Sequence, residues 1–292
     1  MDLNVKCYEC LIRRQVHLAE QQPDDSRRIS YVRDCLQIIL DAPKDATSPY
    51  MVSRFNRAFA KYYPVVDRYS EQKKFSNEFV MKRLTQIKEV LERADEPVKM
   101  ALKFARLGNY IDFGALGDSV NEKDFNSLID KAENDTIDDI EYQNFIRELE
   151  TAKKLLYITD NAGEVVLDKL FIEALQYRFP RLSICVAVRG QAVLNDATRE
   201  DAREIGLDQI VRVIDNGSDI AGTHIPEIGE EMRRELDTSE VILAKGQGNF
   251  ETMLGCGRNV YYAFLCKCEL FVEMFQVPQL TGMFLNELRI QK

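Results

Sequence analysis

Acidic and amide side chains follow two of the apolar runs in the second half of the chain. Asp160 and Asn161 come at the end of the run 155–159, and Asp196 lies a short way beyond the run 182–188. Carboxylate and amide oxygens, with no histidine or cysteine among them, favour Mg²⁺, Mn²⁺ or a similar divalent cation. These three side chains are therefore candidate metal ligands.

Cations and glycine-containing turns follow the other runs. Arg189 and Lys245 each come directly after an apolar run and suit an oxyanion such as phosphate. Gly217 and Ser218, and the segment 246–249 that ends at Asn249, can offer backbone N–H groups at close range. One such strand end could be a turn or a helix cap. Five such strand ends in succession are harder to explain as turns alone. A divalent cation beside cations that suit phosphate describes a phosphoryl-handling site.

A mostly parallel sheet would bring these side chains together. Helical patterns alternate with six short apolar runs, at 155–159, 182–188, 210–214, 241–244, 260–265 and 283–288. This alternation predicts βαβ units and an α/β fold. In open parallel sheets, ligands bind beyond the carboxyl ends of the strands, where the polar residues stand.

The first half of the chain has a different texture. Residues 1–150 lack β-rich runs and contain amphipathic helical patterns separated by prolines. We expect a mainly helical N-terminal domain over 1–150 that covers the site and shapes its specificity. We expect the α/β catalytic domain, with its metal and phosphate sites, over 151–292.

Composition excludes several classes of protein. Of the 292 residues, 39 are Lys or Arg and 48 are Asp or Glu, so the net charge of −9 argues against general nucleic-acid binding. A hydrophobic fraction of 45% indicates a globular chain rather than a disordered one. The two histidines, His17 and His224, cannot build a His-rich metal site. Without a signal-peptide pattern or a run long enough to span a membrane, we expect a cytoplasmic protein with no membrane partner.

Five motifs in order resemble those of the metal-dependent damage-control phosphatases, a family first catalogued as domain of unknown function 89. They are TDNAGE (159–164), LNDATREDA (194–202), NGSD (216–219), KGQGNFE (245–251) and LCKC (265–268). The segment GNYIDF (108–113) resembles a further family motif. The Cys7-x-x-Cys10 start looks like the archaeal and bacterial branch.

The resemblance implies a helical N-terminal part packed on a three-layer, Rossmann-like α/β/α core. It implies a metal, Mg²⁺, Mn²⁺, Co²⁺ or Ni²⁺, held by Asp160, Asn161 and Asp196. Members hydrolyse small phosphomonoesters such as sugar phosphates or damaged phosphometabolites, so the expected partner is a small phosphorylated metabolite. The substrate or phosphate contacts that the resemblance implies are Glu164, Asn109, Asp112, Arg189, Lys245, Glu251 and Lys267.

The expected mechanism is attack by a metal-activated water. Arg189 and Lys245 would stabilise charge on the phosphoryl oxygens. Glu164 or Glu251 would position the water or donate a proton to the leaving oxygen. A phospho-enzyme at Asp160 is the other route, and the sequence after Asp160 lacks the second Asp of haloacid-dehalogenase phosphatases.

Other functions stay open at this point. An S-adenosylmethionine-dependent methyltransferase would need a glycine-rich loop after the first strand, where DNAGE has one glycine. A dinucleotide site on Gly246-x-Gly248 lacks the third glycine. A non-catalytic metabolite-binding protein is the third alternative. Cys7 and Cys10 could form half a zinc site or a redox pair, although incidental reduced thiols explain the seven cysteines more simply.

Overall fold

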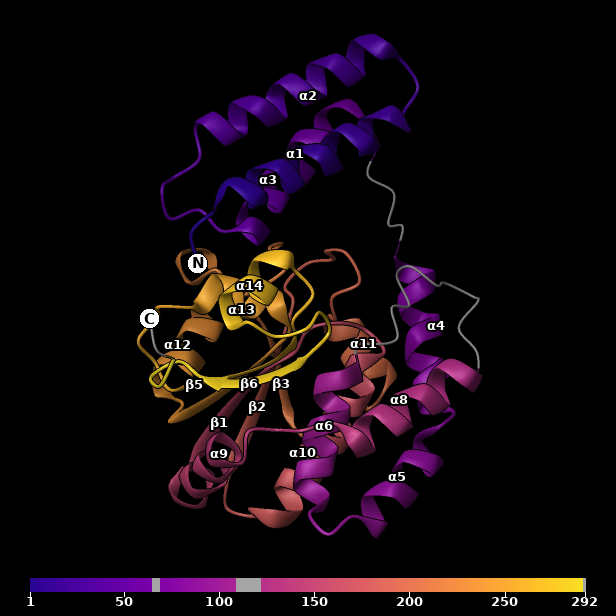
Figure 1. The fold of residues 1–292 in the computed structure, drawn as a ribbon, viewed down its shortest axis with the longest axis vertical. Coiled ribbons are helices and arrows are strands. Elements are labelled where there is room, and N and C mark those ends of the chain that lie inside the picture. Colours follow the sequence, from indigo (N-terminus) through magenta and orange to yellow (C-terminus); the bar gives the residue numbers. More distant parts are fainter. Residues whose placement is uncertain (65–68, 109–121, 291–292) are drawn as a thin grey trace.

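The centre of the molecule is a six-stranded sheet in the order β3-β2-β1-β4-β5-β6 (Figure 1). The computed structural model describes residues 1–64, 69–108 and 122–290. The strands are β1 (Lys154–Ile158), β2 (Ser183–Val188), β3 (Arg212–Asp215), β4 (Val241–Lys245), β5 (Val260–Leu265) and β6 (Gly282–Asn286). The first five pair in parallel and β6 runs antiparallel to β5. The predicted, mostly parallel α/β fold is confirmed.

Both faces of the sheet are buried, which explains the continuous apolar runs. In β1, Leu155 and Tyr157 belong to one apolar cluster, whereas Leu156 and Ile158 belong to another on the opposite face. Successive side chains of a strand point to opposite faces, so a strand covered on both sides needs apolar residues at every position.

Helices form a layer on each face. The first face is covered by α10 (Glu164–Arg178) and α11 (Arg199–Glu204). The second is covered by α12 (Glu230–Thr238), α13 (Gln247–Met253) and α14 (Glu269–Phe275), with the short 3-10 helix η3 (Ile225–Glu227) before α12. The expected three-layer α/β/α core is therefore present.

Helices from the first half of the chain extend the α10 layer. They are α4 (Ser70–Met81), α5 (Leu84–Arg93), α6 (Pro97–Leu107), α8 (Glu122–Asn134) and α9 (Asp139–Thr151). Phe79, Leu102 and Phe145 share one apolar cluster with Val166 of α10 and Leu243 of β4. The apolar packing thus joins these helices to the sheet. The predicted division of the chain at residue 150 stays a prediction, and this cluster crosses it.

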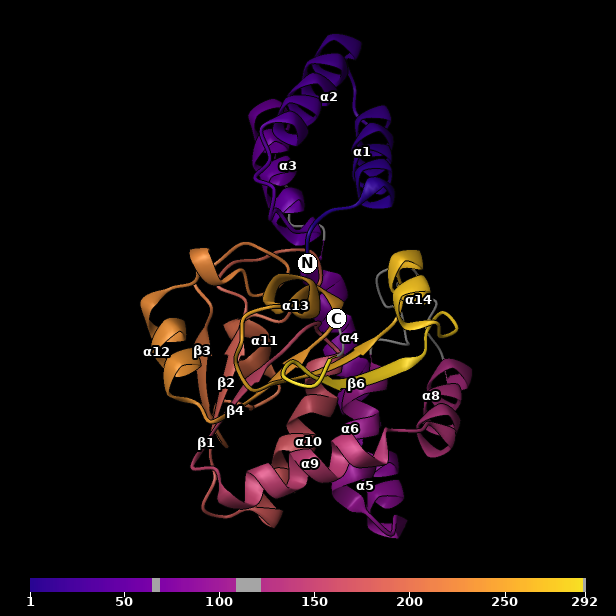
Figure 2. The same cartoon turned by 60° about the vertical axis from the view of Figure 1, so that its left-hand side comes forward.

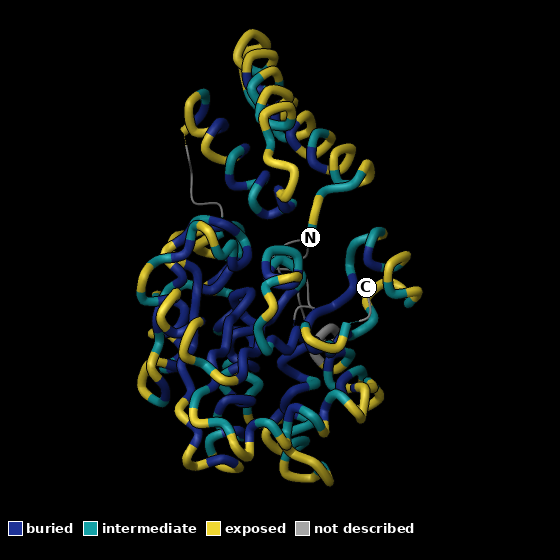
Figure 3. Tube along the Cα trace, turned by 90° about the vertical axis from the view of Figure 1, so that its left-hand side faces the viewer, coloured by how far each residue is buried: buried dark blue, intermediate teal, exposed yellow. Residues whose placement is uncertain are grey.

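Three helices at the start of the chain form a separate unit, which we call the three-helix cap. They are α1 (Val5–Glu20), α2 (Asp25–Leu40) and α3 (Ser48–Tyr62). Leu11, Tyr31 and Phe55 lie in an apolar cluster of the cap's own. The cap stands beside α13, at the end of the sheet where the parallel strands finish (Figures 1 and 2). Much of its outer surface is exposed (Figure 3), whereas every residue of β4 and β5 is buried.

Charged side chains join the cap to the loop that follows β3. Arg57 of α3 donates from Nε and Nη2 to the two carboxylate oxygens of Asp219, at 2.9 and 2.8 Å. Arg54, one turn earlier, pairs with Glu227. The cap is therefore tied to the loop that carries the NGSD motif. None of the described helices is both long and apolar enough to cross a membrane.

Candidate functional site

The candidate site lies between β1 and β4, where the order in which the chain adds strands to the sheet reverses. The chain moves outward to β2 and β3 on one side of β1, and to β5 and β6 on the other side of β4. In doubly wound sheets a crevice forms at this switch point, outside the carboxyl ends of the two central strands. Asp160 follows β1 and Gly246 follows β4, so both residues stand at this switch point.

Gly246 allows the carboxylate of Asp160 to lie directly against the backbone after β4. A Cβ atom at position 246 would meet Asp160 Cγ and Oδ2 at 2.1 Å, and the φ angle of Gly246 is +81°. Glycine is therefore required here both for space and for the backbone conformation.

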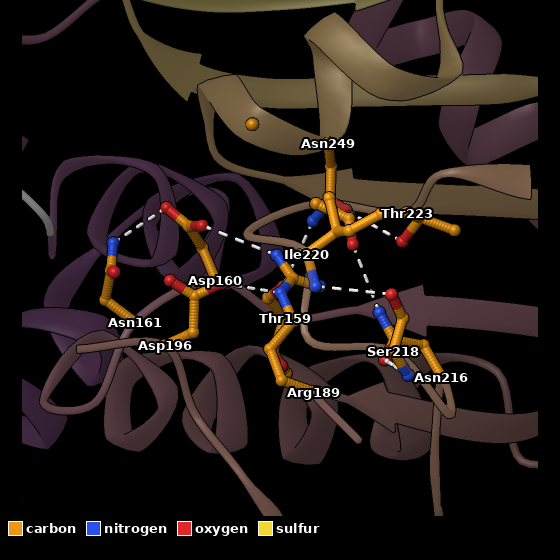
Figure 4. A network of polar contacts seen from close by, with 12 residues as sticks. Thr159, Asp160, Asn161, Arg189, Asp196, Asn216, Ser218, Ile220, Thr223 and Asn249 are labelled. Carbon is orange, nitrogen blue, oxygen red and sulfur yellow. Dashed lines mark hydrogen bonds and ion pairs between the residues drawn. The ribbon is translucent and has the colours of Figure 1, made fainter. Parts of the chain in front are cut away.

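The three candidate metal ligands are brought together by backbone pairing. Asn161 and Asp196 form an isolated antiparallel bridge, and the amide of Ala197 donates to the carbonyl of Asp160 at 2.8 Å. Asn161 Nδ2 donates to Asp160 Oδ2 at 2.7 Å (Figure 4). All three side chains are buried. Residues 35 positions apart in sequence thus form one cluster of hard oxygens.

Arg189 lies beside this cluster and is only 1% exposed. Its Nε donates to Asp196 Oδ2 at 2.5 Å, and its Nη2 lies 3.7 Å from Asp160 Oδ1 (Figure 4). Neither Nη1 nor Nη2 has a hydrogen-bond partner among the residues that the structure describes. Buried polar groups of this kind are normally paired, so a guanidinium with two open nitrogens suits an oxyanion ligand.

Burial makes the site's carboxylates hard to ionise. Loss of hydration raises the pKa of Asp160, and Arg189 only partly offsets this effect. The pKa of Asp196 rises to about 7, mainly through burial and with a further contribution from the charge of Asp160. The single positive charge of Arg189 does not balance the two negative charges of these carboxylates. A divalent cation held by these residues would supply further positive charge.

The donor set fits a hard divalent ion. Across the described ranges, no three His, Cys, Asp or Glu side chains are grouped as a metal site. The candidate centre consists of two carboxylates and the amide oxygen of Asn161, and these three residues stay predicted ligands. Oxygen donors of this type suit Mg²⁺ or Mn²⁺ better than a soft metal.

The ammonium group of Lys245 lies in a fully buried cluster and is not exposed at the end of β4. It donates to Glu164 Oε1 at 2.5 Å, to Asp168 Oδ1 at 2.9 Å and to the carbonyl of Ala105 in α6. Burial raises the pKa of Glu164 to about 8, although Lys245 opposes the shift. Burial alone would lower the pKa of Lys245, but the charges of Asp168 and Glu164 outweigh it and raise that pKa.

The loop after β3 packs against the backbone next to Arg189. Asn216 Oδ1 accepts from the amides of Gly190 and Ser218, at 2.9 and 3.0 Å. A Cβ atom on Gly190 would meet Ser218 N at 2.5 Å, and Gly217 has a φ of +72°. Gly217 and Ser218 therefore lie close to Arg189, and the Ser218 amide is already used within the loop.

The side chains of two other predicted site residues, Asn249 and Glu251, already have hydrogen-bond partners within the protein. Asn249 donates to the carbonyls of Thr159 and Lys245, at 3.1 and 2.7 Å, and accepts from Thr223. It ties the end of β1 to the end of β4 (Figure 4). Glu251 accepts from Gln247 at 2.8 Å, and burial raises its pKa. Their predicted roles in catalysis and binding stay predictions.

Lys267 is the remaining predicted site residue that the structure describes. Lys267 is half-buried after β5, and its charge acts on Asp160. Asn109 and Asp112 lie outside the described residues. The ring of His224 packs on Tyr50 of the cap, with centroids 5.1 Å apart, and burial lowers its pKa. Cys7 and Cys10 are unpaired thiols on α1, and their role stays open.

Asp168 and Asn77 were not predicted from the sequence, and both contact residues of the candidate site. Asp168 lies one helical turn after Glu164 and therefore on the same face of α10, and this spacing was the available signal. Asn77 of α4 accepts from the amide of Gly163 at 2.7 Å and donates to Asp201 at 3.1 Å. No local signal marks Asn77, because its partners lie more than 80 residues away.

Comparisons with known proteins show related sequences and a related fold. Residues 3–281 match the family model of the damage-control phosphatase ARMT1-like domain. A protein named damage-control phosphatase from Archaeoglobus fulgidus is 31% identical over 275 residues, covering 92% of this chain and 93% of that protein. A damage-control phosphatase from Pyrococcus horikoshii is 28% identical, covering 96% of both chains. A crystal structure of a P. horikoshii protein of the domain of unknown function 89 family aligns with a TM-score of 0.84 and 26% identity, covering 98% of this chain and 99% of that chain.

Proposed function

The chain belongs to the ARMT1-like damage-control phosphatase family, and from that premise we propose that it is a metal-dependent phosphatase of small phosphomonoesters. Sugar phosphates and damaged phosphorylated metabolites are the proposed substrate class. In this proposal the protein's partner is a small phosphorylated metabolite, not a nucleic acid or a membrane.

One observation carries the proposal. Arg189 is buried with two nitrogens that have no hydrogen-bond partner among the described residues, beside the carboxylates of Asp160 and Asp196. A group that occupies this place must be anionic toward the arginine and must tolerate two nearby carboxylates. A phosphoryl group bound together with a divalent cation meets both conditions.

Asp160, Asn161 and Asp196 are the proposed ligands of the metal. When bound there, a divalent cation supplies Lewis-acid stabilisation of phosphoryl charge and lowers the pKa of the attacking water. A hydrogen bond already joins the side chains of Asn161 and Asp160, and backbone pairing holds Asp196 beside Asn161. The metal would therefore meet a largely prearranged set of oxygens.

Arg189 and Glu164 have distinct proposed tasks. The guanidinium holds phosphoryl oxygens through Nη1 and Nη2, while its Nε stays on Asp196. Burial raises the pKa of Glu164, and this shift favours the protonated carboxyl that a donor to a leaving oxygen needs. Its Oε2 has no hydrogen-bond partner among the described residues, whereas Oε1 is held by Lys245. Burial of all these groups limits access of bulk water.

Phosphate release tests the proposal directly. The purified chain is treated with EDTA, dialysed, and assayed on p-nitrophenyl phosphate and a panel of sugar phosphates with Mg²⁺, Mn²⁺, Co²⁺ or Ni²⁺ added back. We expect no release without metal and recovery with at least one ion. Full activity in the stripped sample would contradict metal dependence. A blank panel with every ion, together with calorimetric binding of S-adenosylmethionine, would favour a methyltransferase.

A further inference from the structure

The buried cluster around Lys245 contains Asp168, to which the proposed reaction assigns no task. The cluster consists of Lys245 at the end of β4, Glu164 and Asp168 on α10, and Tyr157 on β1. Lys245, Asp168 and Tyr157 are each 0% exposed. We call these four side chains the lysine cluster.

The ammonium group of Lys245 has no donor left for a substrate. An ammonium has three N–H donors, and this one faces three acceptors: Glu164 Oε1, Asp168 Oδ1 and the carbonyl of Ala105. A phosphate could recruit Lys245 only by displacing one of these buried acceptors. The contacts therefore assign the cation to holding Glu164 in place.

Asp168 in turn holds the ammonium group. Its Oδ1 accepts from Lys245 Nζ at 2.9 Å and from the hydroxyl of Tyr157 at 2.6 Å. The two bonds converge on one oxygen from different strands, which fixes the carboxylate against the sheet. Asp168 and Ala105 together determine where Nζ lies, and Nζ determines where Glu164 Oε1 lies.

The electrostatic balance of the cluster points the same way. Two carboxylates share a single ammonium without access to water, so each carboxylate makes the other harder to ionise. Burial is the largest cause of the raised pKa of Glu164; Lys245 opposes the shift, and the charges of Asp160 and Asp168 add to it. Removing the charge of Asp168 would thus change the environment of Glu164 although the two carboxylates are joined only through the ammonium.

We propose that Asp168 is a positioning residue, which acts through Lys245 to hold Glu164 in the orientation that the phosphatase reaction needs. This inference rests on the proposed function. It assigns Lys245 to the support of Glu164, and it assigns Tyr157 to the support of Asp168. A simpler role would be internal stabilisation of α10 on the sheet, which would change the melting temperature alone.

Kinetics of conservative variants separate the two roles. Asp168→Asn keeps the shape and an acceptor oxygen but removes the charge, and Tyr157→Phe removes one bond to Asp168. We expect kcat to fall about 10- to 100-fold in Asp168→Asn and by a smaller factor in Tyr157→Phe, because small misplacement of a reacting group has effects of this size. KM should stay within about twofold of the wild-type value, since neither residue contacts substrate.

Glu235→Gln is the matched control. Glu235 is also a buried carboxylate in an ion pair, accepting from Arg212 at 2.6 Å, but it lies on α12 away from the site. It should alter the melting temperature without altering kcat. An Asp168→Asn enzyme with wild-type kcat would overturn the inference, and so would a change confined to KM.

A structural readout keeps the inference separable from the proposed function. If the wild-type chain releases no phosphate with any ion, the proposed function fails. The positioning arrangement is then judged from crystal structures of Asp168→Asn and Asp168→Ala. Displacement of Lys245 Nζ and of the Glu164 carboxylate in either variant supports it. An unmoved Glu164 in both variants overturns it, and Asp168→Asn alone decides if the alanine variant does not fold.

Discussion

Arg189 and Asp196 are joined by a 2.5 Å hydrogen bond from Nε to Oδ2, which leaves the far side of the guanidinium open toward Asp160. The two residues are seven positions apart in sequence, and both are buried. The bond orients the planar group so that its two remaining nitrogens are available to one ligand. The guanidinium is therefore already oriented in the way that the proposed recognition of a phosphoryl group requires.

Replacing Arg189 with lysine should abolish most of the activity. Lysine keeps the positive charge but cannot bond Asp196 and present a fork at the same time. We expect kcat/KM for phosphate release to fall by about 10²-fold, the usual effect of losing one oriented donor to transition-state charge. Arg212→Lys, at the opposite end of the sheet, should stay within twofold. Equal activity of both variants would mean that Arg189 contributes charge alone.

Gly246→Ala should displace Asp160. The new Cβ would lie 2.1 Å from the carboxylate, and the backbone would be strained at φ +81°. Gly255→Ala is a matched control, because Gly255 has a φ of +90° and a Cβ atom there would meet nothing within 4 Å. Both variants should lose about 1–2 kcal/mol of unfolding free energy from backbone strain. Activity, measured by phosphate release, should be lost only in Gly246→Ala. Thermal unfolding measures the loss of stability in both variants.

Asp160→Ala should lose metal binding and activity together. Titration calorimetry with Mn²⁺ measures the first effect, and phosphate release measures the second. We expect a decrease of about 10²-fold or more in kcat if the ion supplies several kcal/mol of stabilisation. The exposed Asp208→Ala serves as the control for general effects of a removed carboxylate. Unchanged Mn²⁺ binding in Asp160→Ala would move the metal site elsewhere.

The cap should influence substrate affinity through Arg57 and Asp219. This pair joins α3 to the loop that packs on Gly190, next to Arg189. Arg57 is 52% exposed, so the pair adds only about 0.2–1 kcal/mol to stability. We expect Arg57→Ala to raise KM severalfold and to leave kcat nearly unchanged. The swapped double variant Arg57→Asp, Asp219→Arg should recover part of the affinity, and no recovery would indicate that another contact holds the loop.

The same pair has a defined pH dependence. The hydrogen bonds from Arg57 hold the pKa of Asp219 below its ordinary value. A carboxyl with a lowered folded-state pKa stabilises the fold above its unfolded pKa, and this contribution disappears as the pH falls through the lowered value. The difference in unfolding free energy between wild type and Arg57→Ala should therefore be present at neutral pH and vanish under acidic conditions, as denaturant titrations at each pH would show.

Much of the architecture could be predicted from residue patterns. All six apolar runs became strands, because a sheet buried on both faces demands apolar residues at successive positions. The gathering of Asp160, Asn161 and Asp196 followed from the rule that carboxyl ends of parallel strands meet at one edge. The antiparallel pairing of β6 was not predictable, since an isolated apolar run does not encode its direction.

The sequence by itself determined which residue types stand after each strand, and hence that hard oxygens and cations meet at one edge of a parallel sheet. Only the tertiary structure decided what each of those groups faces. Lys245 has the residue type of a phosphate ligand, yet its three donors are taken by groups 77 to 140 positions away. Arg189 has a similar type, yet two of its nitrogens stay open among the described residues. The difference arises from helix packing, because α6 and α10 supply acceptors to Lys245, whereas no described residue accepts a hydrogen bond from Nη1 or Nη2 of the buried Arg189.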